Sequence, residues 1–365
     1  MEKIGESPWN ELTDIEEYHH TVLLSNKIWL FSRKFRCWGS EGNIDIRSTI
    51  IYVLTCFILR PSTNNSATFL DVPQPTHNFG HYVTYRGGYS IYFGLDSKQW
   101  SQKVTYPPVC EDENLEEIIF VVKSRILLLL YSHFGGISFK NLYGFDEINR
   151  TWHQLKSFQV DESCNEIVSG AWKADLTFVE GPDSDSEAFF ISSTESSLNF
   201  IKFKIADDLS ASMCTIYKKS KTDTFKRPVL ATWINNSIFW LDGIHGCGFR
   251  IQPNVLNEVN IVQQEESKHE IAGDYPPFSY NGARCTKLCQ SGEWIHATGD
   301  TAVGMTSVKF CGQIWSLAVA GSPYKWKKLE PEVPECDNVR LIVTVSKEKV
   351  VYIVDPKAGV SKLQL

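Results

Sequence analysis

Short apolar segments separated by turn-forming residues make up most of this chain. The segments are rich in Val, Ile, Thr, Phe, Tyr and Trp and are bounded by Gly, Asn, Asp or Pro, which is the pattern of β-strands. Several come in pairs across a tight turn, such as residues 21–24 and 28–31 around Asn26. Asn and Gly tolerate the positive φ that two-residue hairpin turns require. Only residues 10–19 suggest a helical turn or two, so the pattern predicts an all-β protein built from hairpins.

The predicted hairpins recur at a regular spacing. A mean interval of about 50 residues in an all-β chain is typical of a β-propeller, in which each repeat forms one four-stranded blade. We place the hairpin turns near Asn26, Gly87, Ser124, Ala174, Asn235, Ser291 and Lys347.

Four tryptophans occur at a regular spacing relative to these turns. Trp9, Trp100, Trp152 and Trp326 each precede the next predicted turn by a similar distance, in a polar and aromatic segment. This offset predicts that each lies in the outermost strand of a blade, with its ring packed between neighbouring blades.

Residues 118–155 resemble a blade of the kelch-repeat family. They contain two apolar strands followed by the family's third-strand and fourth-strand markers, which here are Gly135, Gly136, Tyr143, Asp146 and Trp152. Residues 81–100 carry a partial version of the same motif, with Gly87, Gly88, Tyr92, Asp96 and Trp100.

The kelch resemblance implies a single closed β-propeller over residues 1–365. An N-terminal strand within residues 1–20 would complete the last blade, formed by residues 338–365, and Trp9 to Leu12 is the segment expected to do so. Closure of this kind removes exposed sheet edges. We expect seven blades. Six is the alternative, because the interval from Gly87 to Ser124 is short for four strands.

Charge and targeting signals narrow the classes of function. The chain has 43 acidic and 36 basic side chains and a net charge of −7, which argues against a nucleic-acid or acidic-membrane binder. We see no signal peptide and no apolar run suited to a membrane span. The ten cysteines are then expected to be buried thiols, and the chain to be cytoplasmic or nuclear.

Three clusters of chemically active residues do not amount to a predicted site. The pair His77 and His81 and the pair Cys285 and Cys289 each lack the further ligands that zinc needs. Residues 242–248 offer a carboxylate, an imidazole and a thiol, but proximity on a glycine-rich turn does not supply catalytic geometry. We therefore expect no catalytic residue, metal or cofactor.

Charged runs are expected to be solvated connections between strands. Residues 111–117 and 180–187 are acidic, whereas residues 33–36 and 218–227 are basic.

Loops on one face of the ring are the predicted binding surface. In a propeller the connections between the second and third strands of the blades all lie on the same face of the ring. Loops on a rigid scaffold commonly carry function. We assign to this face residues 33–44, 132–140, 180–187, 243–248 and 297–306. Interface hot spots are enriched in aromatic residues and arginine. The expected contacts are therefore Arg36, Trp38, His133, Phe134 and His245.

These observations favour a protein-protein interaction module, a scaffold or substrate-recognition propeller that binds a protein or peptide partner. The kelch resemblance implies a ubiquitin-ligase or cytoskeletal assembly as the setting, with any BTB or F-box domain supplied by a separate subunit. The alternative is a propeller enzyme of the glycosidase, lactonase or oxidase type with its active site at the central channel, and a mainly structural role is a third possibility.

Overall fold

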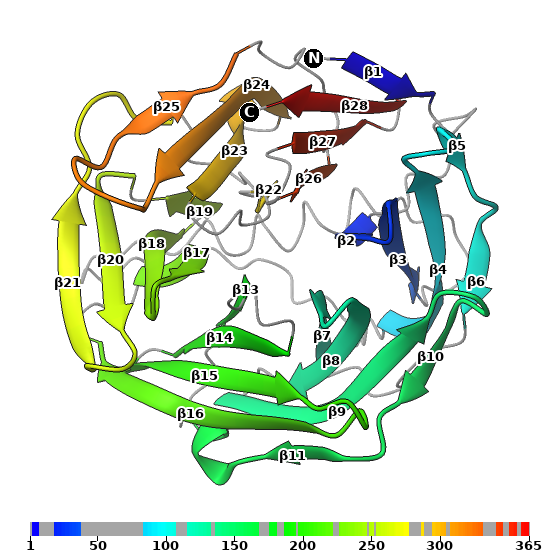
Figure 1. The fold of residues 1–365 in the computed structure, drawn as a ribbon, viewed down its shortest axis with the longest axis horizontal. Coiled ribbons are helices and arrows are strands. Elements are labelled where there is room, and N and C mark those ends of the chain that lie inside the picture. Colours follow the sequence, from blue (N-terminus) through cyan, green and yellow to red (C-terminus); the bar gives the residue numbers. More distant parts are fainter. Residues whose placement is uncertain are drawn as a thin grey trace, which may run out of the picture.

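The computed structural model contains six β-sheets arranged in a ring, with no α-helix in the part of the chain that it describes (Figure 1). Neighbouring strands in these sheets run antiparallel, except that β11 pairs with β16 in parallel. The described residues are 2–6, 18–37, 83–106, 115–132, 136–167, 175–180, 186–194, 196–221, 226–246, 248–251, 253–276, 286–287, 294–303, 307–330, 341–345, 350–355 and 359–364.

The first three blades follow one another along the chain. From its innermost strand outward, blade 1 contains β2 (Tyr18–Leu24), β3 (Lys27–Cys37), β4 (Val83–Gly94) and β5 (Gln99–Trp100), with β6 (Val104–Tyr106) also paired to β4. Blade 2 contains, in the same direction, β7 (Leu115–Val122), β8 (Arg125–Ser132), β9 (Gly136–Asp146) and β10 (Thr151–Gln154), with β12 (Glu166–Ile167) also paired to β9. Blade 3 contains β13 (Asp175–Glu180), β14 (Glu187–Ser193), β15 (Ser197–Ile205), β16 (Ala211–Ser220) and β11 (Phe158–Val160), and the short 3₁₀ helix η2 (Glu162–Cys164) follows β11.

The other three blades complete the ring. Blade 4 contains β17 (Lys226–Ile234), β18 (Ser237–Gly246), β20 (Val255–Asn260) and β21 (Glu265–Glu270), with β19 (Gly248–Ile251) also paired to β18. Blade 5 contains β22 (Thr286–Lys287), β23 (Trp294–Val303), β24 (Ser307–Ala318) and β25 (Trp326–Lys328). Blade 6 contains β26 (Leu341–Val345), β27 (Val350–Asp355), β28 (Gly359–Gln364) and β1 (Glu2–Gly5).

The fold is therefore an all-β, closed six-bladed propeller, the smaller of the two blade numbers considered. The sequence favoured seven blades because Gly87 was predicted to lie at the first hairpin turn of a separate blade. In the structure Gly87 lies inside β4, the third strand of the blade whose first turn contains Asn26. The sequence between β3 and β4 is long, so one blade had been counted as two.

Residues 118–155 form blade 2 with the strand order expected from the sequence. Gly136 begins β9, Tyr143 lies within it, and Asp146 ends it at the turn before β10. Trp100, Trp152 and Trp326 lie in β5, β10 and β25, which confirms the predicted outer strands. Trp9 lies outside the described residues.

Both faces of each blade pack against neighbouring blades, which explains the continuous apolar runs in the sequence. In β8, Leu127 and Leu129 pack toward blade 3, whereas the alternate residues Leu128 and Leu130 pack toward blade 1. Alternation places successive side chains on opposite faces of a strand. A strand buried on both faces therefore has no polar positions to alternate with.

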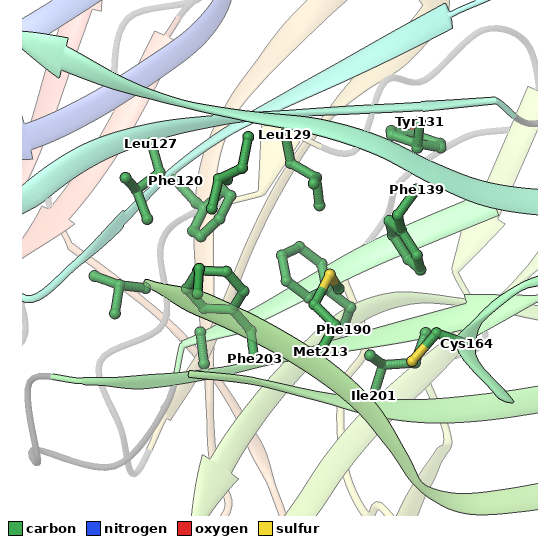
Figure 2. Packing of buried hydrophobic residues seen from close by; sticks show 14 of the residues in the cluster. Phe120, Leu127, Leu129, Tyr131, Phe139, Cys164, Phe190, Ile201, Phe203 and Met213 are labelled. Carbon is green, nitrogen blue, oxygen red and sulfur yellow. The ribbon is translucent and has the colours of Figure 1, made fainter. Parts of the chain in front are cut away.

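Aromatic rings fill the junction between blades 2 and 3 (Figure 2). Phe120 of β7 lies edge-on to Phe190 of β14 and Phe203 of β15, with ring centroids 5.3 and 5.5 Å apart. Edge-to-face contacts between such rings add stability beyond the area that they bury. The same junction includes Cys164, and burial raises the pKa of its thiol to about 11.

The N-terminal strand closes the ring, as predicted, but from an earlier position than Trp9 to Leu12, which lie outside the described residues. Strand β1 is the outermost strand of blade 6 and pairs antiparallel with β28, Glu2 opposite Lys362 and Gly5 opposite Val360. Trp100 of blade 1 donates its indole N–H to the carbonyl oxygen of Glu6, 2.6 Å away. The first and last blades are thus joined directly.

Polar contacts link the outer strands of blades 3 and 4. Tyr217 of β16 donates its hydroxyl to Glu266 of β21 at 2.7 Å, and Lys219 forms an ion pair with the same carboxylate. The hydrogen bond to Glu266 is the main cause that raises the pKa of Tyr217 to about 12. Burial acts to raise the pKa of Glu266, but the bonds from Lys219 and Tyr217 outweigh it and lower that pKa.

Replacing Tyr217 with phenylalanine is expected to lower the free energy of unfolding by about 1 kcal/mol, because a partly exposed hydrogen bond to a carboxylate is lost. Urea unfolding of Tyr217→Phe, Glu266→Gln and the double variant measures the coupling. Additive losses in the double variant would show that the two side chains do not stabilise each other across the blades.

Candidate functional site

The two faces of the ring carry different kinds of connection. In each blade the second strand runs antiparallel to the innermost strand, so first-to-second connections lie on one face and second-to-third connections on the other. We call these the turn face and the ribbon face.

The turn face carries tight hairpins. In blades 1, 2 and 4 the first-to-second connection is a two-residue turn, formed by Ser25 and Asn26, by Lys123 and Ser124, and by Asn235 and Asn236. All six residues have φ between 47° and 67°, which is the left-handed conformation expected at such turns. These three turns confirm the predicted positions at Asn26, Ser124 and Asn235.

The ribbon face carries two-stranded extensions of blades 1, 4 and 5. In blade 1, Phe35 to Cys37 pair with Val83 to Tyr85 after β2 has ended its pairing with β3. The other two extensions are His245–Gly246 with Gly248–Phe249 in blade 4, beyond the pairing of β18 with β17, and Asp300–Val303 with Ser307–Phe310 in blade 5. A register shift lies at the base of the extensions in blades 1 and 5. Such irregularities bend a strand pair and redirect it.

The predicted contact residues fall at the ribbon face wherever the structure describes them. Arg36 lies near the end of β3, opposite Thr84, and His245 lies near the end of β18, opposite Phe249. Trp38 directly follows β3, while His133 and Phe134 fall between β8 and β9; all three lie outside the described residues. The backbone therefore brings Arg36 and His245 to one face but on different blades.

One predicted loop belongs to the opposite face. Residues 180–187 connect β13 to β14, the first and second strands of blade 3, and so lie on the turn face. Ala174, near which a hairpin turn was predicted, lies outside the described residues, and the first-to-second connection of blade 3 follows β13. The prediction numbered the strands of blade 3 one too high, and it therefore assigned this acidic loop to the wrong face.

A polar corner lies on the ribbon face where blades 3 and 4 meet. It contains the end of β14 and the turn after it, with buried Ser192, Ser193, Thr194 and Ser197. Lys221, which follows β16, donates to Ser193 Oγ at 3.2 Å and to the carbonyl oxygen of Thr194 at 2.7 Å. Ser192 is fully buried, and its hydroxyl has no hydrogen-bond partner in this structure. This corner was not predicted, although the run of small polar residues after a buried strand was its signal.

Asp242 of β18 lies at the same corner. Its carboxylate oxygens accept hydrogen bonds from Trp240 Nε1 at 3.0 Å and Asn257 Nδ2 at 3.1 Å. Burial raises the pKa of Asp242, and the two hydrogen bonds and the charges of Lys226 and Lys221 oppose that shift. The carboxyl group is thus positioned by its neighbours, and its interactions are with an indole and an amide rather than with a nucleophile.

The other chemical clusters named from the sequence give no assembled site. His77, His81, Cys285, Cys289 and Cys247 lie outside the described residues. In the described ranges no group of three His, Cys, Asp or Glu side chains is arranged to hold a metal ion. Nor does that part of the chain contain a helix long and apolar enough to cross a membrane.

Comparison with known proteins finds only distantly similar solved structures. No protein-family model matches the chain, and no curated protein matches it in sequence. The solved structures that resemble it include YjhT, 9% identical over 84% of this chain and 82% of YjhT, with a TM-score of 0.44. An exo-β-1,3-galactanase from Clostridium thermocellum is 9% identical over 94% of this chain and 71% of its own, with a TM-score of 0.42. A GH74 xyloglucanase from Xanthomonas campestris is 12% identical over 77% and 42% of the two chains, with a TM-score of 0.36.

Proposed function

We propose that this propeller is a protein-protein interaction module that receives a protein or peptide partner on its ribbon face. Arg36, Trp38, His133, Phe134 and His245 are the proposed contacts. The observation that carries the proposal is the asymmetry of the ring. Two-stranded extensions project from blades 1, 4 and 5 on one face, whereas blades 1, 2 and 4 have two-residue turns on the other. Extensions on a rigid ring present backbone and side chains to a partner without the cost of ordering a loop.

In this role the protein would act as a scaffold or as the substrate-recognition part of a larger assembly, of the ubiquitin-ligase or cytoskeletal kind, in the cytoplasm or nucleus. The propeller would hold its partner in place, and any catalytic activity would belong to the other proteins of the assembly.

Affinity capture of the tagged chain from extract of its native cells tests the proposal. The double variant Arg36→Ala/Trp38→Ala is expected to lose a partner that the unaltered chain retains in stoichiometric amount, with at least a tenfold decrease by quantitative mass spectrometry. The matched control is Arg125→Ala/Ile148→Ala, which removes an exposed arginine and a large exposed apolar side chain from the turn face. Equal retention or equal loss in both double variants would contradict the assignment of the ribbon face.

The second candidate is a propeller enzyme, and the observation that favours it is the partly buried carboxyl group of Asp242 with its raised pKa. Glycoside hydrolysis commonly uses a carboxylic acid of raised pKa as the proton donor, together with a second carboxylate. If the affinity capture yields a monomer without a partner, the enzyme becomes the favoured candidate. Substrate screening of the unaltered chain and of Asp242→Asn would then test it.

A further inference from the structure

The tryptophans of β5, β10 and β25 pack against the preceding blade, and two of them also donate a hydrogen bond to it. Trp100 of blade 1 donates its indole N–H to the carbonyl oxygen of Glu6, which follows the outermost strand of blade 6, at 2.6 Å. Trp326 of blade 5 donates to the carbonyl oxygen of Pro253, which precedes β20 of blade 4, at 2.8 Å. Inside a protein an indole N–H usually has such an acceptor, because leaving it without one is costly.

Trp152 has the equivalent position in blade 2, but its N–H has no acceptor of this kind. Its ring packs in the junction with blade 1, and its Nε1 atom is buried without a hydrogen-bond partner in the part of the chain that the structure describes. Ser90 of β4 is fully buried, and within the same described residues its hydroxyl has no partner either. Buried polar groups in proteins nearly always have a partner, either a protein group or an ordered water.

The strand registers of blade 1 place Ser90 beneath the indole of Trp152. Phe31 lies directly opposite Ser90 on β3, and its ring centroid is 5.5 Å from that of Trp152. On the other side of β4, Tyr106 lies opposite Gly88, and its ring centroid is 6.2 Å from that of Trp152. Gly88 and Ser90 share one face of β4, because successive side chains alternate between faces. An indole that contacts both rings therefore covers these two small residues.

We infer that one ordered water molecule is bound between Ser90 and Trp152 and joins blade 1 to blade 2. The water accepts the indole N–H of Trp152 and forms a second hydrogen bond with the Ser90 hydroxyl, which can either donate or accept. A buried water needs at least two polar partners and enough room. Gly88 and Ser90 bring little side-chain volume to a junction that is otherwise filled by aromatic and aliphatic side chains. The water has the role that backbone carbonyl oxygens have in the junctions of Trp100 and Trp326, and the inference does not depend on the proposed interaction function.

A high-resolution crystal structure of the full chain tests the inference directly. It is expected to show an oxygen atom at hydrogen-bond distance from both Ser90 Oγ and Trp152 Nε1. Trp326 is the internal reference, because its Nε1 should lie beside the carbonyl oxygen of Pro253 and not beside a water. A direct bond between Ser90 and Trp152, or no ordered oxygen in contact with both, would overturn the inference.

A double-mutant cycle tests the same water in solution. Ser90→Ala and Trp152→Phe each remove one partner of the water, so the double variant should lose less unfolding free energy in urea than the sum of the two single losses. The control cycle combines Ser90→Ala with Trp326→Phe, which removes an equivalent indole N–H from the distant junction of blades 4 and 5. Losses in the control cycle should add, and additive losses in both cycles would contradict a shared water. If Trp152→Phe does not fold, the crystal structure of the unaltered chain decides.

Discussion

Replacing Gly5 with alanine is expected to lower the free energy of unfolding by about 3 kcal/mol, because the added methyl group overlaps a ring that cannot move. A Cβ atom at this position would lie 2.3 Å from Cε2 and 2.5 Å from Cζ of Phe93. Phe93 is fully buried, and its ring lies 5.3 Å from that of Trp100, which bonds to Glu6. Moving the ring would disturb the bond that joins blade 1 to the closing strand.

Urea unfolding of Gly5→Ala measures this loss, and Gly144→Ala is the matched control. A Cβ atom at Gly144, also within a strand, would meet only Leu155 Cδ2 at an ordinary 3.5 Å. Hydrogen exchange should show faster opening of β1 and β28 in Gly5→Ala than in the control. Equal stability of the two variants would mean that the closing strand accommodates the methyl group and that closure is more loosely packed than the contact with Phe93 indicates.

Acid is expected to destabilise the protein through His296, by about 2.5 kcal/mol between pH 7.5 and pH 4.5. His296 is almost fully buried in β23, on the opposite side of that strand from Ile295, and its ring lies parallel to that of Trp294. Burial lowers its pKa to about 4. An unfolded histidine has a pKa of about 6.5, so over this interval the unfolded state binds a proton that the folded state does not. Stability is therefore lost as the pH falls from about 6.5 toward 4.

The difference in unfolding free energy between pH 7.5 and pH 4.5 should become smaller by that amount in His296→Gln. Using a difference between two pH values removes any effect of the substitution that does not depend on pH. His153→Gln makes the same substitution at an exposed histidine of β10 and is the matched control. An unchanged pH dependence in His296→Gln would show that this histidine is protonated equally in both states.

The features predicted correctly are those that depend on local backbone chemistry or on a regular spacing of outer strands. The turns at Asn26, Ser124 and Asn235 were found because asparagine and its neighbours adopt positive φ, and two-residue turns require it. The tryptophans of β5, β10 and β25 were found because the outer strands repeat at a regular distance. The turn signal is contained within a few residues, whereas the tryptophan signal is a regular spacing along the chain.

The errors concern which blade, and which position within a blade, a strand was assigned to, rather than whether a segment forms a strand. Gly87 was assigned to a hairpin turn, whereas it lies in β4, because a long insertion separates β4 from β3. In blade 3 the strand before residues 180–187 was assigned as the second strand of the blade, whereas it is the first. Because strand direction alternates, a shift of one strand moves a loop to the other face. Periodicity does not reveal such shifts when repeats differ in length.

The candidate site was predictable only in part. Arg36 and His245 were placed on the ribbon face because both lie near the ends of second strands. The corner formed by Ser192, Lys221 and Asp242 combines residues from β14, the end of blade 3 and β18, which are distant in sequence. Only the pairing of blades around the ring brings them together.

The pairing of β1 with β28 also determines when the ring can be completed. They are the first and the last strand of the propeller along the chain, so β1 is synthesised before the other strands and β28 after them. Ribosomes add about 5–20 residues per second, and the residues from β1 to β28 therefore require on the order of 20 to 70 s. During this time the other blades can form, but β1 has no strand to pair with. Unpaired strand edges promote association between chains, so the newly made protein is most exposed to aggregation in the interval before its last strand emerges.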